Sequence, residues 1–320
     1  MESLSREPDL SVRIGPLVLP NPVGVASGTF GYGQEYQELV DIGRLGALYT
    51  KAVSVEPKAG NKPPRLVETP SGLINSIGLA NPGLKVFLDE KISFLQHLGC
   101  PVLVNVVGET ESEYTAIVEA IEKRIGAFRG GAKSPVDGYE LNLSCPNVEK
   151  GGMAFGTEPG VVERITRTVR SLTNRALIVK LSPNVTDIAQ IALAAEAGKA
   201  DAISCINTVV GMAIDVKTCR PLIARGIGGL SGPAIRPIGV ACVWKAARAV
   251  RIPVIGLGGI TCADDALEYF LAGAAAIQVG TAIFSNPRAP LEILDGIKAW
   301  MRERDIGSIG EIPGLLRFPS

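Results

Sequence analysis

The sequence predicts an α/β fold, a (β/α)8 barrel of the TIM type, over a single domain of residues 1–320. Eight short apolar segments are each followed by residues with helical spacing. These segments are almost continuously apolar, as in parallel strands that helices cover on one face and side chains fill on the other. The length of 320 residues accommodates a barrel of about 250 residues with insertions. The alternative fold is an open, doubly wound sheet.

The first predicted element is an N-terminal hairpin over 12–19, where polar and apolar residues alternate around Gly15-Pro16. We expect it to cover the floor of the barrel. The eight barrel strands are expected over 22–26, 47–53, 102–107, 138–143, 177–181, 202–206, 254–257 and 275–279.

Helical spacing predicts a helix over 34–42 that ends at Gly43, and another over 83–98 that ends at Gly99. Two long segments, 54–81 and 207–230, interrupt the alternation. We expect them to be structureless insertions that serve as lids or binding loops of an active site. The glycine-rich run over 151–156 is expected to be a mobile lid.

The charge balance argues against two classes of partner. The chain has 32 lysines and arginines and 32 aspartates and glutamates, so no net field attracts it to nucleic acid or to an anionic membrane. The first ten residues are polar, unlike a signal peptide, and no run of about 18 apolar residues occurs. We therefore expect a cytoplasmic protein.

The cysteines and the single histidine exclude several kinds of site. No two of the six cysteines are closer than 14 positions, so the spacing of a zinc or iron–sulfur site is absent and no metal is expected. The one histidine, His97, lies near the end of a predicted helix. Hydrolysis by a serine–histidine pair is therefore disfavoured.

Polar residues follow the predicted strands at their C-terminal ends, where barrels of this type have their active sites. Cys145 follows one strand directly, and Pro146 ends the pairing there, so we expect the thiol at the barrel mouth. The alternative is a small buried cysteine. The set comprises Ser27, Lys51, Asn105, Asn142, Cys145, Lys180, Asn207, Thr208, Gly258, Gly259, Gly280 and Thr281. Such a group predicts a polar ligand.

Glycine pairs after the last two strands predict a phosphate site on backbone N–H groups. A dinucleotide fingerprint is disfavoured, because Thr261 stands at the third glycine position and the motif lies late in the chain. A cofactor with a phosphate and a ring that accepts hydride would use the glycines, Lys51, Lys180 and Cys145 together. A Schiff-base aldolase, with one of the two lysines as nucleophile, is the alternative.

A series of motifs in order along the chain carries a family resemblance. They are NPVGVASGTFGYG (21–33), TKA (50–52), NSIGL (75–79), NPG (81–83), NLSCPN (142–147), KLSP (180–183), INT (206–208) and GGLSG (228–232). From about residue 12 to 290 the chain resembles the dihydroorotate dehydrogenases of class 1B, in their FMN-binding catalytic subunit.

The resemblance implies oxidation of (S)-dihydroorotate to orotate in de novo pyrimidine (UMP) biosynthesis. The hydride would pass from C6 to FMN N5 and the C5 proton to Cys145, the catalytic base. The implied FMN contacts are Ser27, Lys51, Ala52, Asn105, Asn142, Lys180, Ile206, Gly232, Gly258, Gly259, Gly280 and Thr281. The implied substrate contacts are Lys51, Asn75, Ser76, Ile77, Gly78, Leu79, Asn142, Asn207 and Thr208. At position 80 this chain has alanine where the family pattern predicts glutamine.

The resemblance also implies a partner. Membrane-bound relatives carry serine in place of Cys145 and an N-terminal anchor, and both are lacking here. The class 1B type implies a homodimer as the core of a heterotetramer, whose second subunit carries FAD and a [2Fe–2S] cluster and passes electrons to NAD. An apolar, partner-facing surface is then expected. Fumarate is another possible acceptor, and a flavin barrel of the dihydropyrimidine dehydrogenase type is the alternative enzyme.

Overall fold

The computed structural model describes residues 7–126, 133–143, 146–147 and 153–318. Eight parallel strands form a closed barrel, in the order β3–β4–β7–β8–β11–β12–β17–β18. Their bounds are β3 Val23–Val25, β4 Ala47–Tyr49, β7 Val102–Val106, β8 Gly138–Asn142, β11 Ala176–Leu181, β12 Ala202–Cys205, β17 Val254–Leu257 and β18 Ala276–Val279. The predicted barrel is confirmed, with strands that are mostly shorter than expected.

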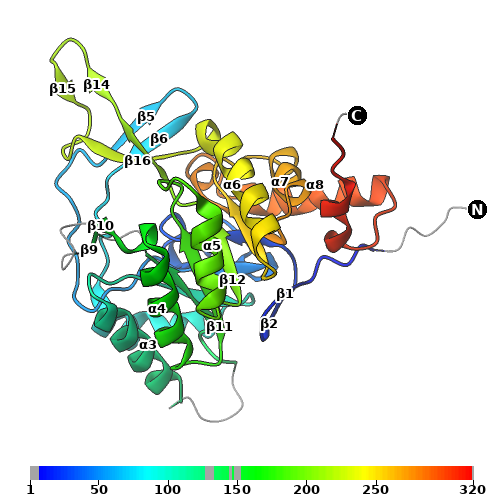
Figure 1. Cartoon of the computed structure of the whole chain (residues 1–320), viewed down its shortest axis with the longest axis horizontal. Helices are drawn as coiled ribbons and strands as arrows, with labels where there is room; N and C mark the ends of the chain where they lie inside the picture. The colour runs from blue at the N-terminus through cyan, green and yellow to red at the C-terminus, as the bar shows by residue number, and fades with distance from the viewer. Residues whose placement is uncertain (1–6, 127–132, 144–145, 148–152, 319–320) are drawn as a thin grey trace, which may run out of the picture.

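Helices surround this barrel (Figure 1). The main ones are α3 Glu111–Gly126, α4 Pro159–Arg170, α5 Ile188–Ala197, α6 Arg236–Ala249, α7 Ala263–Leu271 and α8 Ala289–Glu303. Helix α4 shows why they form: Val161, Val162, Ile165 and Val169 recur on one face and are buried. Proline at its first position needs no intrahelical N–H partner.

The N-terminal hairpin is confirmed as β1 (Val12–Ile14) and β2 (Leu17–Leu19). It lies at the N-terminal end of the barrel, since a Cβ atom on Gly15 would overlap the side chain of Asp201, just before β12. Gly15 has φ +53°, a conformation that favours glycine in the turn. The hairpin therefore covers the floor of the barrel, as expected.

The predicted helix over 34–42 is wrong. Only two short 3-10 turns form, η1 (Gln34–Tyr36) and η2 (Ile42–Arg44). Tyr36 folds back on Phe30 with ring centroids 4.1 Å apart, so aromatic packing replaces a continuous helix. The second predicted helix is present as α1 (Gly83–Val86), a π-helical turn η3 (Phe87–Lys91) and α2 (Ile92–Leu95).

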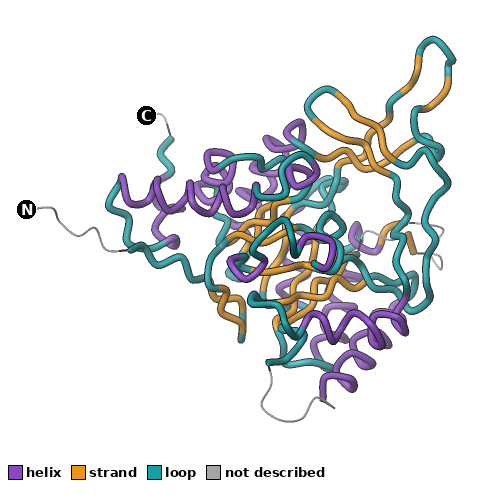
Figure 2. Tube along the Cα trace, turned by 180° about the vertical axis from the view of Figure 1, so that it is seen from behind, coloured by secondary structure: helices purple, strands orange, loops and turns teal. Residues whose placement is uncertain are grey.

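The two long insertions are not structureless, contrary to expectation. Strands β5 (Leu66–Thr69) and β6 (Gly72–Asn75) of the first pair with β16 (Ile227–Ser231) and β13 (Val209–Met212) of the second, in one antiparallel sheet of order β13–β16–β6–β5. A small hairpin, β14 (Ile214–Asp215) and β15 (Arg220–Pro221), extends from it. Figures 1 and 2 show this insertion sheet projecting from the barrel. Its strands are too short for local patterning to reveal a pairing between distant segments.

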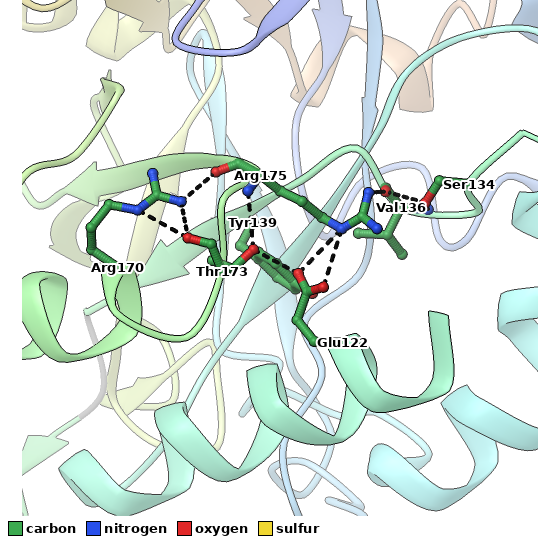
Figure 3. Close-up of polar contacts among 7 residues, drawn as sticks. All are labelled: Glu122, Ser134, Val136, Tyr139, Arg170, Thr173 and Arg175. Atoms are coloured by element: carbon green, nitrogen blue, oxygen red, sulfur yellow. Dashed lines mark hydrogen bonds and ion pairs between the residues drawn. The ribbon is translucent and has the colours of Figure 1, made fainter. Parts of the chain in front are cut away.

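A polar network at the N-terminal ends of β8 and β11 fastens the barrel to its helices (Figure 3). Glu122 on α3 accepts hydrogen bonds from Tyr139 Oη at 2.9 Å, Thr173 Oγ1 at 2.6 Å and Arg175 Nε at 3.2 Å. Arg175 also donates to the Val136 carbonyl at 2.7 Å. Burial and the nearby Glu122 raise the pKa of Tyr139 well above its usual value. This end of such barrels serves stability rather than chemistry.

Replacing Glu122 by alanine is expected to lower the free energy of unfolding by about 1–3 kcal/mol, because the buried Tyr139 hydroxyl loses its acceptor. Urea denaturation measures the change. Glu163→Ala is the matched control: Glu163 pairs with Arg167 on an exposed helix face, where an ion pair contributes only about 0.5 kcal/mol. Equal losses in both variants would contradict the assigned role of the network.

Candidate active site

A cavity of about 900 Å³ opens at the C-terminal ends of the barrel strands, beneath the insertion sheet. Each of the twelve residues expected to contact FMN lines it: Ser27, Lys51, Ala52, Asn105, Asn142, Lys180, Ile206, Gly232, Gly258, Gly259, Gly280 and Thr281. The residues expected to contact substrate, namely Asn75, Ser76, Ile77, Gly78, Leu79, Asn207 and Thr208 with Lys51 and Asn142, line the same cavity. The structure thus brings segments that are far apart in the sequence together around one cavity.

The predicted catalytic base, Cys145, lies outside the described residues. It follows β8, whose last residue, Asn142, lines the cavity. Gly151 and Gly152, the first two residues of the predicted lid over 151–156, are also outside the described part of the chain. Phe155, which belongs to the same run, is buried and packs edge-on against Tyr114 with ring centroids 6.0 Å apart. This side chain therefore belongs to the core and does not cover the cavity.

Side-chain amides and the insertion sheet shape the upper part of the cavity. Asn207 Nδ2 donates to Asn142 Oδ1 at 3.4 Å. Asn75 Nδ2 donates to the Gly229 carbonyl at 3.1 Å, which ties the segment over 75–79 to β16. Ala80, the departure from the family pattern, lines the wall beside that segment. The insertion sheet thus positions the residues expected to recognise substrate.

Buried polar side chains form the floor of the cavity and the layer directly beneath it. Glu140 on β8 is fully buried and accepts hydrogen bonds from Asn105 Nδ2 at 2.6 Å, Ser204 Oγ at 2.8 Å and Gln278 Nε2 at 2.8 Å. Lys180 Nζ lies 3.9 Å from Glu140 Oε2. Neither Glu140 nor Gln278 is predicted as functional from the sequence. The sequence does contain a sign of their role: Glu140 and Gln278 are polar residues within otherwise largely apolar strands. A polar side chain buried there needs hydrogen-bonding partners.

Glycines allow the chain to approach a ligand closely at one side of the cavity. Gly258 and Gly259 have φ of +124° and +72°. A Cβ atom on Gly259 would lie 2.7 Å from the Gly232 carbonyl oxygen and 2.9 Å from the Arg236 nitrogen, too close for any side chain. Gly280 and Thr281 line the cavity as well, where η7 (Thr281–Phe284) begins. This backbone cradle suits a phosphate group.

Comparison with known proteins places the chain in a family. A family model described as "Dihydroorotate dehydrogenase" matches residues 9–301. The chain belongs to the dihydroorotate dehydrogenase family. It is 49% identical to a protein of Trichlorobacter lovleyi and 48% identical to one of Geotalea uraniireducens, each over 97% of this chain and 99% of the relative. A protein of Thermoanaerobacter pseudethanolicus is 48% identical with the same coverage. All three relatives are named "Dihydroorotate dehydrogenase B (NAD(+)), catalytic subunit".

The cavity fits the FMN that the family uses. Asn105 Oδ1 and Gln278 Oε1 are buried at the cavity and accept no hydrogen bond from the described part of the chain. A buried oxygen without a donor is costly, so these atoms call for a ligand with N–H groups. The isoalloxazine ring of a flavin carries such a group, and its phosphate suits the glycine cradle. The two acceptor oxygens and the glycine cradle therefore agree with this cofactor.

Two further findings concern metals and membranes. Among the described residues, no cluster of three or more histidine, cysteine, aspartate or glutamate side chains could ligate a metal ion. Within the same ranges, no helix combines the length and the apolar character that crossing a bilayer requires.

Proposed function

We propose that this chain is the catalytic subunit of an NAD-linked dihydroorotate dehydrogenase and oxidises (S)-dihydroorotate to orotate in de novo pyrimidine biosynthesis. One observation carries the proposal: a single cavity at the barrel mouth gathers every described residue that the motifs assign to FMN or to substrate. The full-length similarity to proteins named as such subunits supports it.

The cofactor end of the cavity would bind FMN through two groups of residues. Gly258, Gly259, Gly280 and Thr281 would hold the phosphate, and Asn105 and Lys180 would face the ring system. When bound, FMN would supply a hydride acceptor next to the substrate. Ser27 helps to orient Lys180, whose Nζ donates to Ser27 Oγ at 3.1 Å.

The substrate end would recognise a carboxylated pyrimidine ring. Asn75, Asn142 and Asn207 provide both donors and acceptors for the edges of the ring. The Lys51 ammonium would offset the negative charge of the carboxylate. This charge favours dihydroorotate over the neutral dihydropyrimidines on which the alternative flavin barrels act.

Cys145 would take the proton from C5 of the substrate. Making the ring double bond needs a base opposite the hydride acceptor, and a thiolate is suited to that role. The position of Cys145, three residues after the cavity-lining Asn142, supports the assignment.

The proposal extends to the organisation of the chain. One continuous hydrophobic core runs from Leu10 to Ile312, which supports a single domain over 1–320. The five described cysteines are free, as is usual in a reducing compartment, and this supports a cytoplasmic location.

A partner subunit with FAD and a [2Fe–2S] cluster would carry the electrons to NAD, around a homodimer of this chain. Such an assembly requires apolar contact surfaces. Large apolar side chains are exposed on the insertion sheet and its hairpin: Val210, Met212, Ile214, Val216 and Ile227. A projecting surface of this kind suits an interface with another chain.

Purifying the chain alone tests the proposal. We expect a yellow protein with a flavin spectrum that oxidises dihydroorotate with an artificial dye and fails to reduce NAD, because electrons need the partner to reach NAD. Dihydrouracil is the control substrate and should be inactive. A colourless preparation that does not take up added FMN would refute the flavin assignment. Efficient NAD reduction by the isolated chain would refute the partner, and activity with fumarate would identify a different acceptor.

A further inference from the structure

The centre of the barrel holds a carboxylate that the proposed reaction does not use. Glu140 lies one layer below the cavity floor, and donors from three other strands, β7, β12 and β18, converge on it. Oε2 accepts from Asn105, and Oε1 accepts from Ser204 and Gln278. Asn105 and Gln278 line the cavity, so two amides connect this carboxylate to the ligand site.

Glu140 also lies next to Lys180, a positively charged residue that lines the cavity. The Lys180 ammonium lies 3.9 Å from Glu140 Oε2 and reaches the cavity wall, where it donates to Ser27. Both side chains are at most 5% exposed. Tyr49 packs nearby, and burial, together with Glu140, raises the pKa of its phenol, which keeps it neutral. The pair therefore consists of one negative and one positive group in a medium that screens charge poorly.

Hydrogen bonding between the strands does not by itself explain why residue 140 carries a negative charge. An uncharged amide at position 140 could make the same number of hydrogen bonds, and a buried ion pair is weak grounds for stability because both ions lose hydration. The carboxylate also acts on the groups that lie between it and the cavity. Two consequences follow from the geometry. Glu140 holds the Asn105 amide by its nitrogen and leaves Oδ1 without a donor among the described residues, and it offsets the charge of Lys180.

We propose that Glu140 is a positioning residue that sets the redox potential of the bound flavin by balancing the charge of Lys180 from beneath. The inference rests on the proposed FMN site. Reduction makes a flavin more negative, so a nearby ammonium favours the reduced form and a carboxylate opposes it. Glu140 thus keeps the potential low enough for electrons to pass on to the acceptor.

Glu140→Gln removes the charge and keeps the shape of the side chain. The double variant described below carries the same reoriented Gln278 amide, so comparison with it separates the effect of the charge from that of the amide. The amide oxygen can take the place of Oε2 and still accept from Asn105. The amide nitrogen can then donate to Gln278 Oε1, which accepts nothing from the described residues, after the Gln278 amide turns over. FMN content should stay at the parent level. The affinity ratio of reduced to oxidised flavin should rise about tenfold, which equals about 30 mV in a two-electron midpoint potential.

Ser204→Ala is the matched control, because it removes one hydrogen bond to Glu140 and no charge. Its midpoint potential should stay close to the parent value. The double variant Glu140→Gln/Lys180→Met removes both charges, a change that buried pairs often tolerate, and its potential should return toward the parent value. If Glu140→Gln alone does not fold, Lys180→Met provides the comparison: its potential should be lower than that of the double variant.

Two results would overturn the inference: a Glu140→Gln protein that binds FMN at the parent potential, or an equal shift in Ser204→Ala. Equal potentials in Lys180→Met and the double variant would overturn it as well. A parent chain that binds no FMN would instead refute the proposed function, so the two failures are distinguishable.

Discussion

Alanine at position 145 is expected to leave FMN bound and to lower kcat with dihydroorotate by about 10²- to 10⁴-fold, the usual contribution of a general base. Without the thiol, no group is assigned to accept the C5 proton. Steady-state oxidation with an artificial dye measures kcat, and the visible spectrum measures FMN content. Serine at the same position should retain a little turnover at high pH, because a hydroxyl is a far weaker acid than a thiol.

Cys219→Ala is the matched control for this experiment. Cys219 is free and exposed on the insertion hairpin, so its loss should leave kcat unchanged. Parent-level turnover in Cys145→Ala would remove Cys145 from the mechanism. A drop that is equal in both variants would indicate a general effect of losing a cysteine.

Alanine at position 259 is expected to weaken FMN binding by about 10- to 100-fold, which corresponds to the strain of a non-glycine residue in a rare conformation. The new Cβ atom would lie 2.7 Å from the Gly232 carbonyl oxygen, and the φ of +72° is unfavourable for alanine. The turn that would hold the phosphate has to move. Titration of the FMN-free protein with FMN measures the dissociation constant.

Gly226→Ala is the matched control, because it places alanine at a positive φ without the close contact that a Cβ atom at position 259 would make. Gly226 has a similar φ of +84°, but a Cβ atom there meets no described atom within 4 Å, and the residue is not part of the cavity wall. Its FMN affinity should equal that of the parent. An unchanged dissociation constant in Gly259→Ala would show that this turn does not contact the cofactor.

Local patterns were sufficient to predict the barrel. The strand over 177–181 is apolar except for Lys180, and β11 appears there because its side chains are buried on both faces. The helix predicted over 34–42 does not form, because its local pattern is outweighed by other contacts. Its spacing is helical, but so short a helix is marginal by itself, and the contact of Tyr36 with Phe30 stabilises a different conformation.

The insertion sheet could not be predicted from local patterning. Asn75 pairs with Gly229 across more than half of the barrel sequence, and each strand has only four or five residues. Such strands are stable only as members of a larger sheet. Read separately, the two segments look like long loops, and only their pairing gives the cavity its upper wall.

The sequence by itself determined the barrel, the kinds of side chain at the strand ends and the family. These features depend on the strand period, the turn glycines and the order of the motifs, all of which can be recognised from residues close together in the sequence. Only the tertiary structure decided that Lys180 has a buried counter-charge in Glu140, and that the Asn105 and Gln278 oxygens are left for a ligand. Glu140, Ser204 and Gln278 lie far apart in the chain, and closing the barrel brings them within hydrogen-bonding distance. The charge balance beneath the cavity is therefore a property of barrel closure.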